Sequence, residues 1–245
     1  MEHEAQSIVL AFAAVDEERR RRSAHAPLER AVRWVKRLQH QRLSLTHARL
    51  LSDPSWGQGG RFFLDQLYGD RDDRGRDAQF LRVVPTMLRV LPQEGVAALC
   101  RLARLHALSE RLDGRMGDHL LVGQRQDAAK AYVEAWRRAS SRAEREEQVA
   151  AMREIGASLG AVVHLPMLSG ALRLMKGPAR LAGLSELHAF LAEGLRCFRA
   201  IDHVDRFVER IGADELALID ALFTPEGPCP AVIAEATASI GEVPW

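Results

Sequence analysis

Hydrophobic residues recur every three or four positions along most of the chain, the spacing that gathers them on one side of an α-helix. Near the start, Ile8, Phe12 and Val15 follow this pattern, and a run of charged residues comes after them. A second helix is expected to begin at Pro27, because proline is favoured in the first turn of a helix, and to continue to Leu51. The pattern therefore predicts two amphipathic helices at the start of the chain.

Proline and glycine residues divide the middle of the chain. Residues 53–60 contain one proline and three glycines and are predicted to interrupt the helical pattern. Asp77 is expected to cap the next helix, which Pro85 is expected to kink. A further helix begins at Pro92, and the glycines of residues 114–123 predict a looser stretch and a possible subdivision of the fold.

The second half of the chain is expected to hold further helices. Ser141 and Glu144 have the spacing of a capping box, which marks the start of a helix ending near Leu165. Gly156 and Gly160 on that helix would let a neighbouring helix approach closely. The other elements are expected at residues 124–139, 166–177, 178–200 and 202–223, with an irregular tail at 224–245 that includes a short helix at 231–240.

Composition supports a helical class. The chain has 36 Ala, 32 Leu and 31 Arg, against 17 Val, 7 Ile, 4 Thr and 2 Tyr, so strong helix formers far outnumber strand formers. Of the 245 residues, 47% are hydrophobic, which is enough for a sizeable core. We therefore predict an all-α protein, a compact bundle of roughly nine or ten helices forming one domain over residues 1–245.

Charge is balanced overall but unevenly distributed. The net charge of +1 gives no general reason to expect nucleic acid or an anionic membrane as a partner. Residues 16–49 hold ten Arg or Lys and four acidic residues, whereas residues 200–245 hold two Arg and nine acidic residues. These segments can attract each other within one chain or between two chains, or they can be two solvated helix faces whose ion pairs each contribute little. Together with the many amphipathic helix faces, the opposite charges make a homodimer the expected assembly, and a protein partner is a further possibility.

The cysteines and the apolar segments bear on location. Cys100, Cys197 and Cys229 have no metal-site or redox spacing, and their odd number argues against a disulfide framework. Acidic residues near the N-terminus differ from the basic start of a secretory signal, so we expect a cytoplasmic protein. Residues 155–172 lack formal charges, but Pro166 divides them, which favours a buried helix and a turn over a membrane span.

The sequence shows no convincing catalytic motif. It contains no HExxH motif of zinc proteases, and its glycine cluster at 57–60 lacks the Lys and Ser or Thr of a phosphate-binding loop. The GxSxG spacing of serine hydrolases occurs at residues 156–160, but inside a predicted helix and without the strand that precedes the serine in those enzymes. The segment that begins at Asp70 resembles a calcium loop in part. Arg74 and Leu81 occupy positions of that loop where oxygen ligands are needed.

One helix carries the main candidate site. His106, Glu110 and Asp113 lie four and three residues apart and border the apolar side of their helix. An imidazole and two carboxylates on adjacent turns can bind a metal ion or share a proton. The alternative is a structural role, in which these groups bond to each other or to arginines of a neighbouring helix. In that case, Asp113→Asn is expected to lower the melting temperature.

Two further residues are secondary candidates. His164 ends the uncharged helix and is expected to be at least half buried, where it could bind a metal ion or bond a carbonyl at the helix end. Asp77 is the other, with helix capping as its alternative role. No cofactor can be named from these residues.

Several segments resemble a family of uncharacterised, all-helical proteobacterial proteins. They are FFLDQLYG, RDAQFLRVVPTMLRVLP, LHALSERLD and MKGPARLAGLSELHAFLAEGLRCF, and the resemblance covers most of residues 56–223. It implies a stand-alone bacterial domain and no known activity. It also implies that Tyr68, Asp77, Pro85 and Asp113 belong to recurring segments, for folding or for function.

Two classes of function remain open. One is a helical interaction or regulatory module that self-associates, which fits the lack of catalytic motifs and the many apolar helix faces. The other is an enzyme or ligand carrier, in which His106, Glu110 and Asp113 meet His164 or Asp77 inside the bundle.

Overall fold

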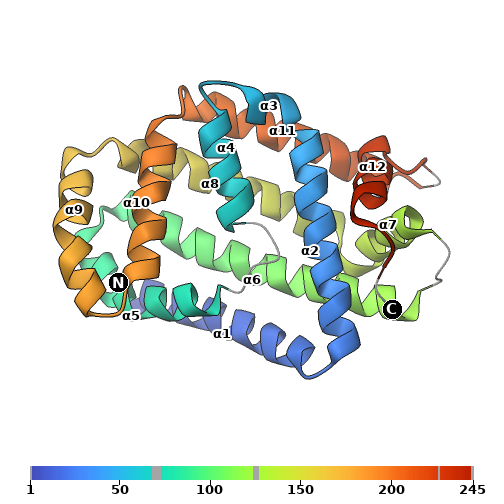
Figure 1. Cartoon of the computed structure of the whole chain (residues 1–245), viewed down its shortest axis with the longest axis horizontal. Coiled ribbons are helices and arrows are strands. Elements are labelled where there is room, and N and C mark those ends of the chain that lie inside the picture. The colour runs from blue at the N-terminus through green and yellow to red at the C-terminus, as the bar shows by residue number, and fades with distance from the viewer. Residues whose placement is uncertain (1, 68–72, 124–126, 226, 244–245) are drawn as a thin grey trace.

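The computed structural model describes residues 2–67, 73–123, 127–225 and 227–243, and all regular secondary structure in these ranges is helical (Figure 1). The all-α prediction is confirmed, with a somewhat larger number of helices than expected. The described helices are α1 (Glu2–Ser23), α2 (Ala26–Thr46), α3 (Ala48–Ser52), α4 (Gly57–Leu67), α5 (Arg74–Val90), α6 (Gln93–Val122), α7 (Ala128–Ala139), α8 (Arg142–Val163), α9 (Pro166–Leu181), α10 (Ser185–Arg199), α11 (Val204–Phe223) and α12 (Ala231–Ile240).

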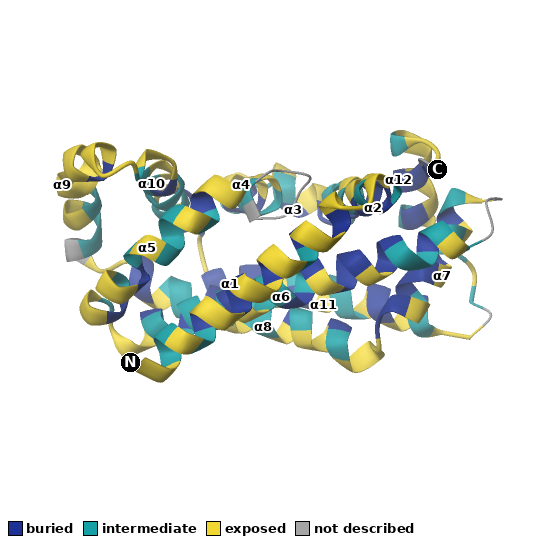
Figure 2. Ribbon diagram, turned by 90° about the horizontal axis from the view of Figure 1, so that it is seen from below, coloured by how far each residue is buried: buried dark blue, intermediate teal, exposed yellow. Residues whose placement is uncertain are grey.

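Helix α6 is the central element of the bundle. It is 30 residues long, and α1, α2, α7 and α8 all pack against it. Figure 2 shows that its buried positions face these neighbours, while the outer surfaces of the surrounding helices are exposed. Leu112 and Met116 of α6 are completely buried. The packing of α1, α2, α7 and α8 therefore depends on which side chains α6 presents.

The expected looser stretch at residues 114–123 is wrong, because α6 continues through it to Val122. Its glycines are packing positions. A Cβ atom on Gly117 would lie 2.6 Å from Val32 Cγ2 of α2, and one on Gly114 would lie 2.6 Å from Glu18 Oε2 of α1. Glycine at these positions lets α1 and α2 come close to α6, and this contact offsets the weak helix propensity of glycine.

Two other expected breaks are displaced. Helix α4 begins at Gly57, so only residues 53–56 interrupt the pattern, and a Cβ atom on Gly59 would lie 2.3 Å from Ile201 Cδ1. Helix α9 continues past Pro178 to Leu181. The chain then turns at Gly183, whose φ of 69° lies in the left-handed region that glycine adopts readily.

The capping box at the start of α8 is confirmed. The Ser141 hydroxyl accepts a hydrogen bond from the Glu144 backbone N–H, and the Glu144 side chain accepts one from the Ser141 backbone N–H. Among the described residues, no single helix has the length and hydropathy needed to cross a membrane. Helix α8 and residues Leu168–Leu181 of α9, which meet at 90°, have together the length and composition of a membrane-crossing segment, and nothing else supports a crossing there.

The close approach expected at Gly156 and Gly160 is also confirmed. Helix α11 packs on α8 there, and a Cβ atom on Gly156 would lie 2.2 Å from Val208 Cγ1, while one on Gly160 would lie 3.3 Å from the side chain of Val204. These two glycines therefore set the distance between α8 and α11.

We expect Gly156→Ala to lower the free energy of unfolding by about 1–3 kcal/mol, because the added methyl group overpacks this contact. Gly170→Ala on α9 is the matched control, since no heavy atom of the described residues, apart from the adjacent helix backbone, lies within 4 Å of its added Cβ. That variant should be neutral or stabilised by about 0.5–1 kcal/mol, since alanine favours the helix. Urea denaturation of both variants measures the difference, and equal stabilities would contradict this account of Gly156.

Candidate functional site

His106, Glu110 and Asp113 lie on the side of α6 that faces α1 and α2, as their spacing predicts. Glu110 and Asp113 are almost fully buried, with 4% and 3% of their surface exposed. His106 is less buried, with 26% of its side chain exposed. The sequence therefore identified a polar stripe of α6 that lies inside the bundle.

Cations from two helices surround the Glu110 carboxylate. Arg22 of α1 forms an ion pair with Oε2, and Lys36 of α2 places its Nζ 2.7 Å from Oε1. Arg19 of α1 places Nη2 3.8 Å from Oε1. One carboxylate of α6 thus holds both neighbouring helices by charge.

Asp77 of α5 joins the same group from the other side. Its Oδ2 atom lies 2.7 Å from Arg19 Nη1 and 3.4 Å from His106 Nε2. The capping role expected for Asp77 is wrong, because α5 begins at Arg74 and Asp77 lies inside the first turn. We call the group formed by Arg19, Arg22, Lys36, Asp77, His106 and Glu110 the ionic cluster.

The charges of the ionic cluster set the pKa values of its acids. Burial alone would raise the pKa of Glu110, but Lys36 and Arg22 outweigh it and lower this pKa to about 2. Burial likewise opposes ionisation of Asp77, whose pKa is nevertheless lowered by His106 and Arg19. Both carboxylates are therefore ionised at neutral pH, and they serve as partners for cations rather than as proton donors.

Asp113 lies in a different environment although it is on the same side of α6. Its Oδ1 accepts a hydrogen bond of 2.8 Å from Gln39 Nε2 of α2, which is a neutral donor. Burial raises the pKa of Asp113, and the negative charge of Glu110 adds to this effect, while Lys36, Arg145 and the hydrogen bond from Gln39 oppose it. The fold therefore disfavours the charged form of Asp113.

His164 is not part of this group. It is the C-cap residue of α8 and is exposed, so the expectation that it is at least half buried is wrong. His164 follows the last residue of α8, where the chain bends by 90° into α9. Arg199 of α10 bonds the carbonyls of Val163 and Leu165 instead.

The described residues contain no group of three His, Cys, Asp or Glu side chains placed to hold a metal ion. The metal-binding role of His106, Glu110, Asp113 and His164 remains a prediction from the sequence. Tyr68, the remaining candidate, lies outside the described residues.

A second buried ion pair joins two residues that the sequence analysis did not single out. Arg42 of α2 places Nη1 2.5 Å from both carboxylate oxygens of Glu215 on α11, and His47 Nε2 lies 3.1 Å from Oε1. Burial would raise the pKa of Glu215, but Arg42 and His47 lower it to about 2. The opposite charges of residues 16–49 and 200–245 indicated that such a pair could form. Arg42 and Glu215 belong to these two segments, and their ion pair lies within one chain.

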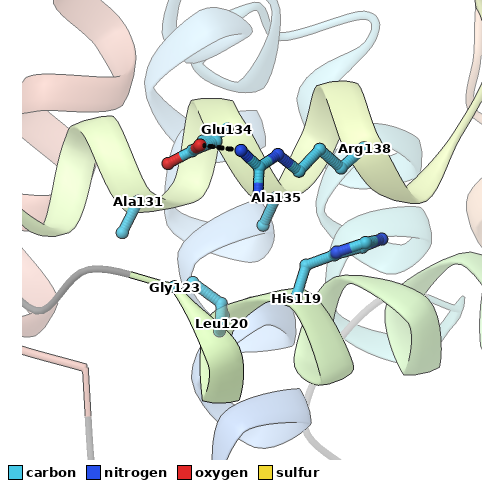
Figure 3. A pocket seen from close by; sticks show the side chains of 7 residues that line it. All are labelled: His119, Leu120, Gly123, Ala131, Glu134, Ala135 and Arg138. Carbon is cyan, nitrogen blue, oxygen red and sulfur yellow. Dashed lines mark ion pairs between the residues drawn. The ribbon is translucent and has the colours of Figure 1, made fainter.

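A shallow hollow lies on the surface between α6 and α7 and holds about 250 Å³, open solvent included (Figure 3). It is lined by His119, Leu120, Gly123, Ala131, Glu134, Ala135 and Arg138. Glu134 and Arg138 are both on α7 and form an ion pair with each other at 2.6 Å. The lining shares no residue with the ionic cluster, so this hollow offers the cluster no access for a ligand.

A family model described as a domain of unknown function (DUF8198) matches residues 18–227. No curated protein and no solved structure matches the chain. The match includes all the residues of the ionic cluster.

We expect Glu110→Gln to lower the free energy of unfolding by roughly 3–5 kcal/mol, because it leaves buried cations without their counter-charge. Asp113→Asn is the matched control on the same side of α6. The amide oxygen can still accept from Gln39, and the cost of burying a charge is removed, so this variant should keep or raise stability at neutral pH. This differs from the lower melting temperature expected from the sequence. Thermal unfolding at pH 7 compares the two variants. A larger loss of stability for Asp113→Asn than for Glu110→Gln would contradict the central role given to Glu110.

Acid should destabilise the protein through Glu110 and Glu215. Their pKa values in the fold are about 2, below the ordinary 4.5, so their stabilisation is complete above pH 4.5 and is lost as pH falls toward 2. Each contributes on the order of 3 kcal/mol in this window. Urea unfolding at a series of pH values should show a shallower loss for Glu110→Gln than for the wild type. Glu134→Gln, at an exposed carboxylate, should leave the slope unchanged, and identical slopes for all three would refute the prediction.

Proposed function

We propose that this chain, which belongs to the DUF8198 family of domains of unknown function, acts as a helical interaction module in the bacterial cytoplasm. In this proposal the ionic cluster is structural, and the protein works by contact between its surface and a partner. The described acids of the cluster each contact a cation of the same chain, which supports a structural role.

The observation that carries the proposal is an exposed apolar surface on α9. Leu174 is 80% exposed, Met175 51% and Leu181 92%. With the exposed residues Ala171 and Pro178 they form what we call the α9 face. Large apolar side chains grouped on one exposed surface are typical of a contact site.

Self-association is the second part of the proposal. Val9 and Leu10 on α1 are exposed by 47% and 59%, and they provide an apolar contact for a second copy. Part of the opposite charge of residues 16–49 and 200–245 is already neutralised within one chain by the Arg42–Glu215 ion pair. We therefore place the contact between two copies on α1 and attribute it to apolar side chains.

The alternative is an enzyme or ligand carrier with a site at His106, Glu110 and Asp113. It would require a ligand to displace Lys36 or Arg22 from Glu110. Uptake of a metal ion or small molecule by the purified protein, lost in Asp113→Asn without loss of stability, would favour this alternative over the module.

A photo-crosslinking amino acid at position 174 tests the module in living cells. We expect crosslinks to a macromolecule or a lipid from position 174, and none from position 122, where Val122 is also 79% exposed but lies at the other end of the bundle. The same probe at position 10 should join two copies of the chain. Absence of crosslinks from both positions 174 and 10 would overturn the proposal.

A further inference from the structure

Helix α9 has three distinct sides. Leu168, Leu172 and Ala179 lie four and seven residues apart and form the side that is partly or fully buried, where α9 packs on α10. His188 of α10 fixes this contact by a 2.7 Å hydrogen bond to the Leu172 carbonyl. The α9 face lies on a second side, so packing on α10 leaves it exposed.

The third side of α9 is basic. Arg173, Lys176 and Arg180 lie three, four and seven residues apart, and all are exposed. No Asp or Glu occurs anywhere in residues 155–185, although the whole chain has 33 acidic residues. With about 3.6 residues per turn, these cations lie on the side of α9 opposite to the α9 face, and no acidic residue of this stretch neutralises them.

The shape of this region also restricts the partner. Figures 1 and 2 show α9 at one end of the molecule, with its outer surface exposed. Among the described residues, no heavy atom outside the adjacent helix backbone lies within 4 Å of a Cβ built on Gly170 or Gly177, which flank Leu174 along the helix. The face is therefore a ridge. A partner helix usually binds in a groove. An exposed helix with an apolar ridge on one side and basic residues on the opposite side is typical of a helix that lies in the surface of a negatively charged membrane.

We propose that α9 binds the surface of an anionic lipid bilayer. The α9 face enters the boundary between headgroups and acyl chains, and Arg173, Lys176 and Arg180 contact the anionic headgroups. Their long side chains allow the charges to stay among the headgroups while Leu174 and Leu181 are buried. This inference rests on the proposed function, since it names the partner of the α9 face, and it replaces the expectation from net charge that no membrane is bound.

The test is sedimentation of the purified full chain with vesicles of phosphatidylcholine, with and without phosphatidylglycerol. We expect binding to the anionic vesicles only, and weaker binding as salt is added. Exchanging the three basic residues of α9 for glutamine should reduce the partition coefficient roughly fivefold for each charge, and so on the order of a hundredfold together. Leu174→Asp and Leu181→Asp should each reduce it by roughly tenfold or more.

Matched variants separate these effects from general charge and folding. Glutamine at Arg30, Arg37 and Arg49, three exposed arginines outside α9, changes the net charge equally and should leave binding unchanged. Val122→Asp is the control for an exposed apolar residue. Circular dichroism should show the same helix content in all variants, because the replaced side chains are exposed.

Three outcomes would overturn the inference: no binding to either kind of vesicle, equal binding to both, or equal losses for the α9 and control variants. If vesicle binding fails but crosslinks from position 174 reach a protein or a second copy, the interaction module stands and the bilayer does not. If both fail, the proposed function falls as well.

Discussion

Neutralisation of one buried carboxylate determines how the N-terminal half of this protein packs. Glu110 lies on the central helix, and ionising it in the interior is favourable only because Arg22 and Lys36 reach it. These two residues come from α1 and α2, so the charge of α6 fixes both helices. Buried ion pairs often contribute little net stability compared with apolar packing, but they penalise any arrangement that separates the partners. The role of Glu110 is therefore to select one packing of α1 and α2.

The sequence predicted the location of this site and missed its chemistry. Helical periodicity was enough to place His106, Glu110 and Asp113 on one inward side of α6. It could not show that Glu110 and Asp113 have opposite pKa shifts, because these shifts arise from residues far away in the chain. Lys36 is 74 positions from Glu110 and is one of only three lysines in the chain. Which helices lie next to each other decides the chemistry, and periodicity carries no such information.

The same limit explains the helix boundaries. Gly59 and Gly117 have weak helix propensity, which is why the sequence predicts no helix at these positions. In the structure both lie inside helices where another part of the chain packs closely, 3.0 Å or less from the position of a Cβ atom. The capping box at Ser141 depended only on neighbouring residues, and it was predicted correctly. Local signals were reliable for features that form locally and failed where contacts between helices decide.

The Arg42–Glu215 pair has a consequence for the order in which the chain matures during synthesis. The two residues are 173 positions apart. The guanidinium of Arg42, which is 3% exposed in the fold, therefore has to stay hydrated until α11 has emerged from the ribosome. The first two helices can form early, but this end of α2 reaches its final environment only when synthesis is almost complete. A ribosome that stalls before α11 would release a chain with this end of α2 still open to water and to chaperones.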